Sequence, residues 1–442
     1  MDRVADGPQA RAADALGVRR EPDEETRAAA RAVRPNHELT LLKGGAELFP
    51  ALVQAIDAAS REVLLETYIF EFAGAPLRVA EALERAAARG LRICVVMDGI
   101  GTGDVPAEWQ QRWKAAGVHW RLFNPASGWR VLVPRRWRRL HRKLCVVDEA
   151  VAFCGGVNML DDLRDPNYGV LEKPRFDFSV RVQGPLVADV HDTMTRLWLR
   201  LQVGREMRHA DLEGAMRAAV AAGHAGSAAR DRELRGREPW RPSQAMGEGA
   251  RAAFVLRDNV RYRRRIEATY RLAIAQARRE ILIANAYFIP GVRLQRALLR
   301  AAERGVRITL LLQGKYEYFM QHHASRAVYG KLLAGGIEII EYAPSFLHAK
   351  VAVMDGPAGT VATVGSSNLD PLSLLLAREA NVFVVDDAFG AELRGHLRDA
   401  IAQEGVRVES EAHGRRPWPG RALSWLAWAM IQIALLATGK RY

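Results

Sequence analysis

Cysteine is scarce in this sequence, and so is lysine. The three cysteines, Cys94, Cys145 and Cys154, cannot form a disulfide framework, and their positions inside apolar runs argue against a structural zinc site. A reduced, cytosolic setting is therefore expected. Lysine supplies only eight of the 64 basic residues, so a lysine at a patterned position carries more information than an arginine.

The chain also lacks an apolar opening segment and an excess of acidic residues. Residues 1–37 are polar and rich in arginine and alanine, which predicts a mostly disordered tail and no secretory signal. The net charge of +13 implies an anionic partner: nucleic acid, an anionic membrane surface or a phosphate-bearing substrate. With 442 residues, 49% of them hydrophobic, the chain is long enough for two or three globular domains.

One long segment is repeated. ALERAAARGLRICVVMDG at 82–99 and ALLRAAERGVRITLLLQG at 297–314 are identical at ten of 18 aligned positions. Each copy predicts an amphipathic helix, a glycine stop and a buried strand, and a strand-like run precedes each copy at 62–70 and 280–288. The repeat therefore predicts an α/β fold of two similar units, each a sheet flanked by helices.

The domain boundaries follow from the repeat and from composition. We expect a first domain at 38–202 and a second at 252–410. Between them, 203–251 is rich in Gly, Ala, Arg and Pro and predicts a linker with one helical piece near 211–222. The remaining segment, 411–442, is expected to form a membrane-associating helix.

A histidine, a lysine and an aspartate recur at the same spacing after each repeat copy, with an asparagine further on. The two sets are His141, Lys143, Asp148 and Asn158, and His348, Lys350, Asp355 and Asn368. Because residues two apart on a strand share a face, each histidine faces the same way as its lysine. A following hairpin is expected to return each asparagine beside its pair, and both aspartates are expected to fix the turns where their strands end.

These paired motifs resemble the phospholipase D superfamily, and within it the chain is similar to the shorter, B-type bacterial cardiolipin synthases. The resemblance covers roughly 38–410 and includes LHAKVAVMDGPAGTVATVGSSNLDPLSL at 347–374. It implies two phospholipase D-like α/β sandwich domains packed as a pseudo-twofold pair, with both motifs catalytic. The first copy has Gly156 where the second has Ser366, and no counterpart of Ser367 precedes Asn158, so a supporting hydroxyl is expected only in the second half.

The residue types suit the cleavage of a phosphodiester. Lysines and asparagines can bind its non-bridging oxygens, one imidazole can attack phosphorus to form a phosphohistidine, and the other can act as acid and base. By analogy with related enzymes we take His141 as the nucleophile and His348 as the acid–base, although the reverse order stays open. Asp177 and Glu379 are candidates to hold the imidazoles, or are ordinary strand-edge carboxylates. Neither a metal nor another cofactor is expected.

Two segments point to a membrane. The insertion at 123–140 combines tryptophans with arginines beside His141, which suits an anionic headgroup interface or simply a solvated basic loop. The stretch at 422–439 is apolar and flanked by basic residues; as a helix it is about 27 Å long, slightly short of a bilayer core. We expect it to lie in the cytoplasmic face of the cell membrane, with a full span or docking on the protein's own core as alternatives.

The expected activity is phosphatidyl transfer from phosphatidylglycerol, or another phospholipid, to a second phosphatidylglycerol or to glycerol. The alternative is a metal-independent phosphodiesterase, phospholipase D or nuclease of the same superfamily, which the positive charge fits equally well. A non-catalytic membrane scaffold is a third possibility, but it predicts the decay of one motif and both are intact. Nucleic acid is the less favoured partner, and no obligate protein partner is inferred.

Overall fold

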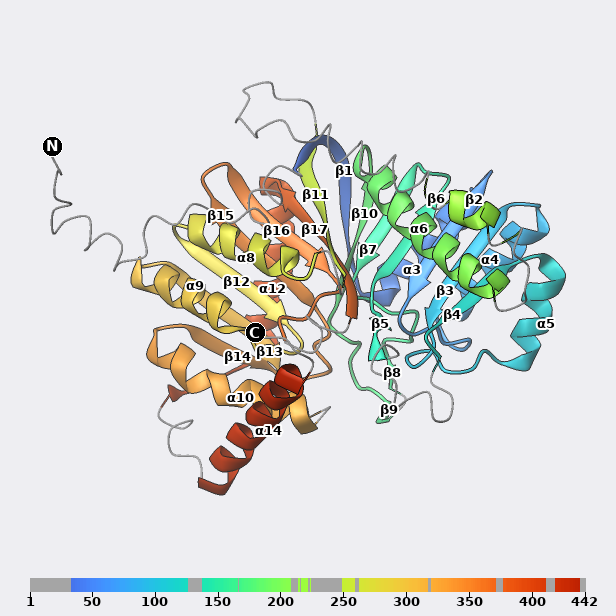
Figure 1. Cartoon of the computed structure of the whole chain (residues 1–442). Coiled ribbons are helices and arrows are strands. Elements are labelled where there is room, and N and C mark those ends of the chain that lie inside the picture. The colour runs from blue at the N-terminus through green and yellow to red at the C-terminus, as the bar shows by residue number, and fades with distance from the viewer. Residues whose placement is uncertain are drawn as a thin grey trace, which may run out of the picture.

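The computed structural model describes most of the chain beyond residue 32. The described residues are 33–125, 137–165, 167–207, 214, 216–221, 223, 249–258, 262–316, 319–370, 377–410 and 418–437. Figure 1 shows two α/β halves side by side, the first in blue to green and the second in yellow to red.

The elements of the first half include the strand, helix and strand predicted from the repeat at 62–99. They are β1 (Arg34–Lys43), α3 (Gly44–Asp57), β2 (Glu62–Thr67), α4 (Leu77–Ala88), β3 (Arg92–Asp98), α5 (Ala107–Ala116), β4 (His119–Phe123), β5 (Arg139–Leu140), β6 (Lys143–Val147), β7 (Val151–Gly155), β8 (Arg164–Asp165), β9 (Gly169–Val170), β10 (Phe178–Gln183) and α6 (Leu186–Glu206). The described residues 214, 216–221 and 223 are helical, in agreement with the helical piece expected inside the linker.

The second half repeats this order. Its elements are β11 (Ala250–Arg257), α8 (Arg265–Gln276), β12 (Glu280–Asn285), α9 (Val292–Glu303), β13 (Arg307–Gln313), α10 (Phe319–Ala334), β14 (Glu338–Tyr342), β15 (Lys350–Gly356), β16 (Gly359–Gly365), β17 (Ala377–Val385), α12 (Asp387–Glu404), β18 (Gly405–Arg407) and α14 (Trp418–Ala437). The predicted glycine stops are confirmed: Gly90 and Gly305 follow α4 and α9 with φ of 89° and 86°.

The two halves share one mixed sheet. Its order is β18-β14-β13-β12-β15-β16-β17-β11-β1-β10-β7-β6-β2-β3-β4, so the strands on either side of the β11–β1 junction mirror one another. Within each half β2–β3–β4 and β12–β13–β14 are parallel, and the motif hairpins β6–β7 and β15–β16 are antiparallel. This mirror order confirms the predicted α/β class and the pseudo-twofold pair of similar units.

Alternating side chains of the strands fill separate cores. In β2, Leu64 joins a central core shared by both halves, whereas Val63 and Leu65 join the core under α3, α4 and α5. The central core includes α6 and α12, and a third core lies under α8, α9 and α10. Since the central core contains strands from both halves, it holds the two motif hairpins in a common frame.

Three predicted boundaries differ from the structure. Strand β1 begins at Arg34, so the predicted boundary at residue 38 is too late. Arg34 and His37 pair with Ala252 and Ala250 of β11. Because this pairing joins the two halves and its first residues are polar, no local hydrophobic pattern in the sequence marks where the strand begins. For the same reason β11 begins before residue 252, at Ala250. Helix α6 continues past the predicted boundary at residue 202 to Glu206. Residues 1–32 and most of 203–251 lie outside the described residues.

Helix α14 packs against α10, as Figure 1 shows at the lower edge of the second half. Ser424 and Ala427 are buried, whereas its exposed large apolar side chains are Trp425, Leu426, Met430 and Ile433. One face therefore docks on the protein and another remains apolar and open. Within the described part of the chain, no helix combines the length and apolarity needed to cross a membrane.

Candidate active site

The two motif histidines meet in one cavity. His141 and His348 both line a hollow of about 440 Å³ between the halves, although they lie far apart in the sequence. Asn158, Asn368 and Asp177 line it as well. The hollow is therefore built from both motifs.

Each histidine is held by the opposite half of the chain. Short strand β5 ends at Leu140 and pairs in parallel with β17, and the backbone N–H of His141 donates to the carbonyl of Arg378 at 3.1 Å. In the second half, the N–H of His348 donates to the carbonyl of Phe176 at 3.0 Å. The relative position of the imidazoles is thus set by backbone contacts between the halves.

Each predicted carboxylate contacts the histidine of the opposite half. His141 Nδ1 lies 3.1 Å from Glu379 Oε2, and His348 Nδ1 lies 2.6 Å from Asp177 Oδ2. Both carboxylates are buried, so each can orient one imidazole and leave its Nε2 for chemistry. These contacts favour an orienting role over that of ordinary strand-edge carboxylates, and each pair joins both domains.

Ser366 and Gly156 make the two pairs unequal. The Ser366 hydroxyl donates to Glu379 Oε2 at 2.5 Å. At the matching position, a Cβ on Gly156 would lie 2.3 Å from Asp177 Oδ1, so only glycine lets Asp177 approach. Asp177 accepts the N–H of Phe178 at 2.8 Å instead. Ser367 is buried and its hydroxyl donates to the carbonyl of Asn368.

The two histidine–carboxylate pairs also differ in their pKa values. Burial raises the pKa of Asp177 to about 7, despite nearby Lys350. Burial also acts to raise the pKa of Glu379, but His141, Lys143 and the Ser366 hydroxyl outweigh it and lower that pKa below its usual value. Burial lowers the pKa of both histidines, that of His348 strongly. The His141–Glu379 pair is therefore a neutral imidazole on a carboxylate, while the Asp177 side can retain a proton near neutral pH.

The two lysines are buried beside their histidines. Lys143 Nζ donates to the His141 carbonyl at 2.8 Å, and Lys350 Nζ donates to the His348 carbonyl. Burial lowers the pKa of Lys143 to about 7. A phosphate entering the cavity would restore the positive charge that burial disfavours.

Asp148 and Asp355 lie at the other end of their strands and do not line the cavity. Asp148 accepts hydrogen bonds from Ser60 N, Arg61 N and Glu62 N at 2.7–2.9 Å, and Asp355 accepts from the backbone at 278–280. Although both belong to the motifs that the resemblance marks as catalytic, neither aspartate contacts the cavity, and their hydrogen bonds agree with the expectation that they fix turns.

We expect Asp148→Ala to lower the free energy of unfolding by about 1–3 kcal/mol, because several backbone donors lose their acceptor. The KM for substrate should change less than about twofold. Urea unfolding and steady-state kinetics measure the two effects. Glu149→Ala is a matched control, since Glu149 shares the positive φ of Asp148 (56° against 51°) but makes none of these bonds. A normal stability with lost activity would contradict the structural role.

The sequence reasoning missed several cavity residues. Tyr68 packs on His141 with ring centroids 4.9 Å apart, and Lys143 Nζ lies 5.4 Å from the Tyr68 ring centre. Arg175 was also missed and lines the cavity, whereas Arg139, which lines it too, belongs to the insertion predicted to lie beside His141. Trp137, from the predicted insertion, lies at the cavity and is 44% exposed; residues 126–136 lie outside the described part.

One cluster in the described chain could hold a cation, but it lies away from the cavity. Glu62, Glu149 and His191 have ligand atoms within 4.8 Å of one another. Glu62 begins β2, whereas the cavity lies beyond the end of that strand at Tyr68. Glu62 already pairs with Arg92 and with His191 at 2.9 Å, so these residues form an ion-pair network.

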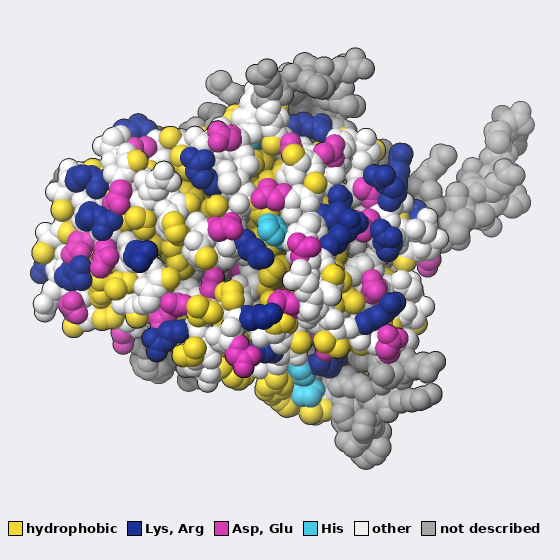
Figure 2. All heavy atoms as spheres, turned by 180° about the vertical axis from the view of Figure 1, so that it is seen from behind, with side chains coloured by type: hydrophobic (Ala, Val, Ile, Leu, Met, Phe, Trp, Pro, Cys, Tyr) yellow, Lys and Arg dark blue, Asp and Glu magenta, His cyan; other side chains and the backbone are white. Residues whose placement is uncertain are grey.

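The surface charge does not form a continuous basic stripe on the face shown in Figure 2. Lysine and arginine side chains there are interspersed with aspartate and glutamate. A continuous basic track is what a nucleic-acid backbone requires, so this face gives no support to the nuclease alternative.

Comparisons with known proteins identify the family of this chain. The family model described as "Cardiolipin synthase, PLD-like domain" matches residues 52–168 and 270–401, more than half of the chain. Cardiolipin synthase B of Salmonella typhi is 34% identical over 409 residues, covering 90% of this chain and 89% of its own length. Cardiolipin synthase B of Escherichia coli K12 is 37% identical over 399 residues with the same coverage.

Solved structures show the same fold at lower identity. A phosphatidylserine synthase of Haemophilus influenzae Rd KW20 matches with a TM-score of 0.62 at 13% identity, covering 94% of this chain and 99% of its own. The chain therefore belongs to the cardiolipin synthase family, with the phospholipase D-like domain in two copies, and is a phosphatidyltransferase.

Proposed function

We propose that this protein transfers a phosphatidyl group from one phosphatidylglycerol, through a phosphohistidine at His141, to a second phosphatidylglycerol. The observation that carries the proposal is the convergence of two histidine–carboxylate pairs, exchanged between halves, on one cavity. The relatives named cardiolipin synthase B support the choice of a phospholipid substrate.

The unequal pairs support the proposed roles of the two histidines. His141 is neutral and its Nδ1–H points at an ionised Glu379, which leaves the Nε2 lone pair to attack phosphorus. Burial strongly lowers the pKa of His348, so near neutral pH the proton of this pair lies on Asp177, which donates it to His348 Nδ1 and leaves a hydrogen on Nε2 of the neutral ring. This Nε2–H is the proposed donor to the leaving glycerol, and the ring takes the Asp177 proton at Nδ1 as it gives up the other.

The reaction then balances in two steps. His141 Nε2 bonds to phosphorus as the bond to the glycerol oxygen breaks, and the proton from His348 leaves with glycerol. His348 next takes the proton of the acceptor hydroxyl, whose oxygen bonds to phosphorus and releases His141. Lys143, Lys350 and the two asparagines would neutralise the phosphate oxygens throughout.

Incubating the purified protein with labelled phosphatidylglycerol in detergent tests this function. We expect cardiolipin and glycerol in equal amounts, with unchanged yield in the presence of a chelator. Phosphatidic acid as the main product would favour a phospholipase D, and cleavage of DNA at a comparable rate would favour a nuclease. Chelator-sensitive turnover would contradict the proposed metal-independent chemistry.

The apolar open face of α14 supports a membrane location. Trp425, Leu426 and Ile433 are all more than half exposed, and a phospholipid substrate must be drawn from a bilayer. We propose that α14 lies in the cytoplasmic face of the membrane. Co-sedimentation with phosphatidylglycerol vesicles, lost in Trp425→Ser/Ile433→Ser, is the expected result; retained binding would argue against it.

The pKa values predict an alkaline decline in activity. Lys143 and the Asp177–His348 pair carry their protons below a pH of about 7 and lose them above it. We expect kcat/KM to fall about tenfold between pH 7 and pH 8.5, because both the phosphate-binding charge and the acid are lost. A kcat/KM that stays constant or rises to pH 9 would contradict this assignment.

A further inference from the structure

The two halves differ at one matched position beside the histidines. Asp98 ends β3 and Gln313 ends β13, at equivalent places in the repeat. Asp98 Oδ2 accepts the N–H of Leu140 at 2.7 Å, and Gln313 Oε1 accepts the N–H of Leu347 at 3.2 Å. Each side chain thus holds the residue that precedes a reactive histidine.

The second polar atom of each side chain differs in its hydrogen-bond partners. Asp98 Oδ1 is paired with the Arg139 guanidinium at 3.0 Å, so the site in the first half is complete in itself. Gln313 Nε2 is a buried N–H donor that has no acceptor among the described residues. Because Oε1 is committed to Leu347, the orientation of the amide is fixed. A buried donor without an acceptor is costly, so a ligand that supplies an acceptor here would be stabilised by this N–H.

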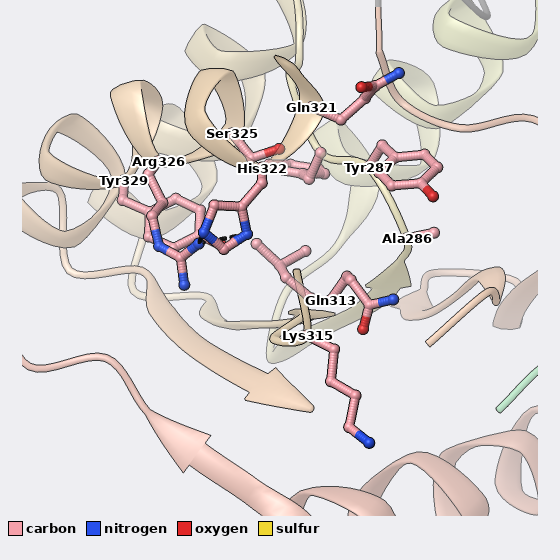
Figure 3. Close-up of a pocket in the computed structure, with 11 residues that line it drawn as sticks. Ala286, Tyr287, Gln313, Lys315, Gln321, His322, Ser325, Arg326 and Tyr329 are labelled. Carbon is pink, nitrogen blue, oxygen red and sulfur yellow. Dashed lines mark hydrogen bonds between the residues drawn. The ribbon is translucent and has the colours of Figure 1, made fainter. Parts of the chain in front are cut away.

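Gln313 lines a second, smaller hollow, shown in Figure 3. Lys315 follows β13, and Ser325 and Arg326 face the hollow from α10. Arg326 is paired with Glu341 at 2.8 Å and contacts His322, so Lys315 supplies the net positive charge. Gln313 and Lys315 therefore bring an N–H donor and a cation to the same side of the hollow, opposite Arg326 and Tyr329 (Figure 3).

This hollow adjoins the catalytic cavity. Tyr287 and Gln321 line both spaces. The smaller hollow measures only about 20 Å³, which is room for about one water-sized group, such as a single phosphate oxygen. The rest of a headgroup would have to extend toward the larger cavity.

Transfer to a lipid acceptor requires a second anion site at such a place. The attacking hydroxyl of phosphatidylglycerol is separated from its own phosphate by one glycerol unit, so that phosphate must rest beside the reacting phosphorus and apart from it. Resting on the function proposed above, we infer that Gln313 Nε2 and Lys315 bind a phosphate oxygen of the acceptor headgroup. The subsite selects an acceptor that carries a phosphodiester over free glycerol.

Soluble acceptors test the subsite without a contribution from membrane binding. With phosphatidylglycerol as donor, glycerol is compared with glycerophosphoglycerol, its deacylated headgroup. The wild-type protein should show the lower KM for glycerophosphoglycerol. Lys315→Gln should raise that KM about tenfold and leave the KM for glycerol unchanged, since one charge-assisted contact is lost. Lys331→Gln, at the exposed far end of α10, is the matched control.

A second variant probes the unmatched donor. Gln313→Glu keeps an acceptor for Leu347 but replaces the N–H donor by negative charge, so the KM for glycerophosphoglycerol should rise again while that for glycerol changes little. Equal changes for both acceptors, or none, would overturn the inference. If Lys315→Gln only relieves inhibition by inorganic phosphate, the hollow is a free-phosphate site and the assignment to the acceptor is wrong. A wild-type protein that uses neither acceptor contradicts the proposed function, and this inference falls with it.

Discussion

Replacing His141 by glutamine should reduce phosphatidyl transfer by at least about a thousandfold. The change removes the nucleophile, and no other imidazole in the described cavity except His348 can take its place. His348→Gln should cost about as much, because the leaving glycerol then departs without a proton. Cardiolipin formation from labelled phosphatidylglycerol measures both losses.

The control must separate chemistry from folding. His119→Gln alters an exposed histidine at the start of β4 and should keep full activity. Both active-site variants should unfold within a few degrees of the wild-type protein. Substantial turnover in a folded His141→Gln protein would show that the nucleophile lies elsewhere.

Glu379→Gln and Asp177→Asn should each lower kcat by about 10²–10⁴. Each change leaves the shape of the side chain almost intact. Glu379→Gln removes the charge that accepts the Nδ1–H of His141, and Asp177→Asn removes the titratable proton that Asp177 shares with His348. Because the contacts cross between the halves, a substitution in one domain should disable the histidine of the other.

The two carboxylate variants should also differ in their pH profiles. Asp177→Asn removes the group whose pKa is raised to about 7, and should change the alkaline decline; Glu379→Gln should leave that decline in place. Glu338→Gln, on β14, is a control remote from the cavity lining. A loss smaller than about tenfold in both variants would reduce these carboxylates to structural groups.

Much of this site follows from local sequence patterns. The strand period places His141 beside Lys143 and His348 beside Lys350, and the repeat predicts that both sets serve one function. Both lysines are indeed buried beside their histidines. The strand period predicts that each histidine and its lysine share a face, because the two residues are two apart on one strand.

The pairing of each histidine with a carboxylate from the other half could not be predicted from local sequence patterns. Glu379 and His141 are 238 residues apart, and Asp177 and His348 are 171 apart. No local period reports which carboxylate crosses to which histidine; that depends on how the β1–β11 junction joins the two halves. The need for Gly156 is equally invisible in the sequence, because it arises from the approach of Asp177. The repeat alignment places Asp98 opposite Gln313. Only the hydrogen bonds in the structure show that the two side chains hold equivalent residues and differ in their second polar atom.

Mapping the covalent intermediate tests the central claim most directly. The wild-type protein is mixed with phosphatidylglycerol, denatured within the first turnover and digested, and the masses of the peptides that contain His141 and His348 are measured. A phosphatidyl adduct on His141 alone is the predicted result. An adduct on His348, or full turnover with no adduct on either histidine, would contradict it.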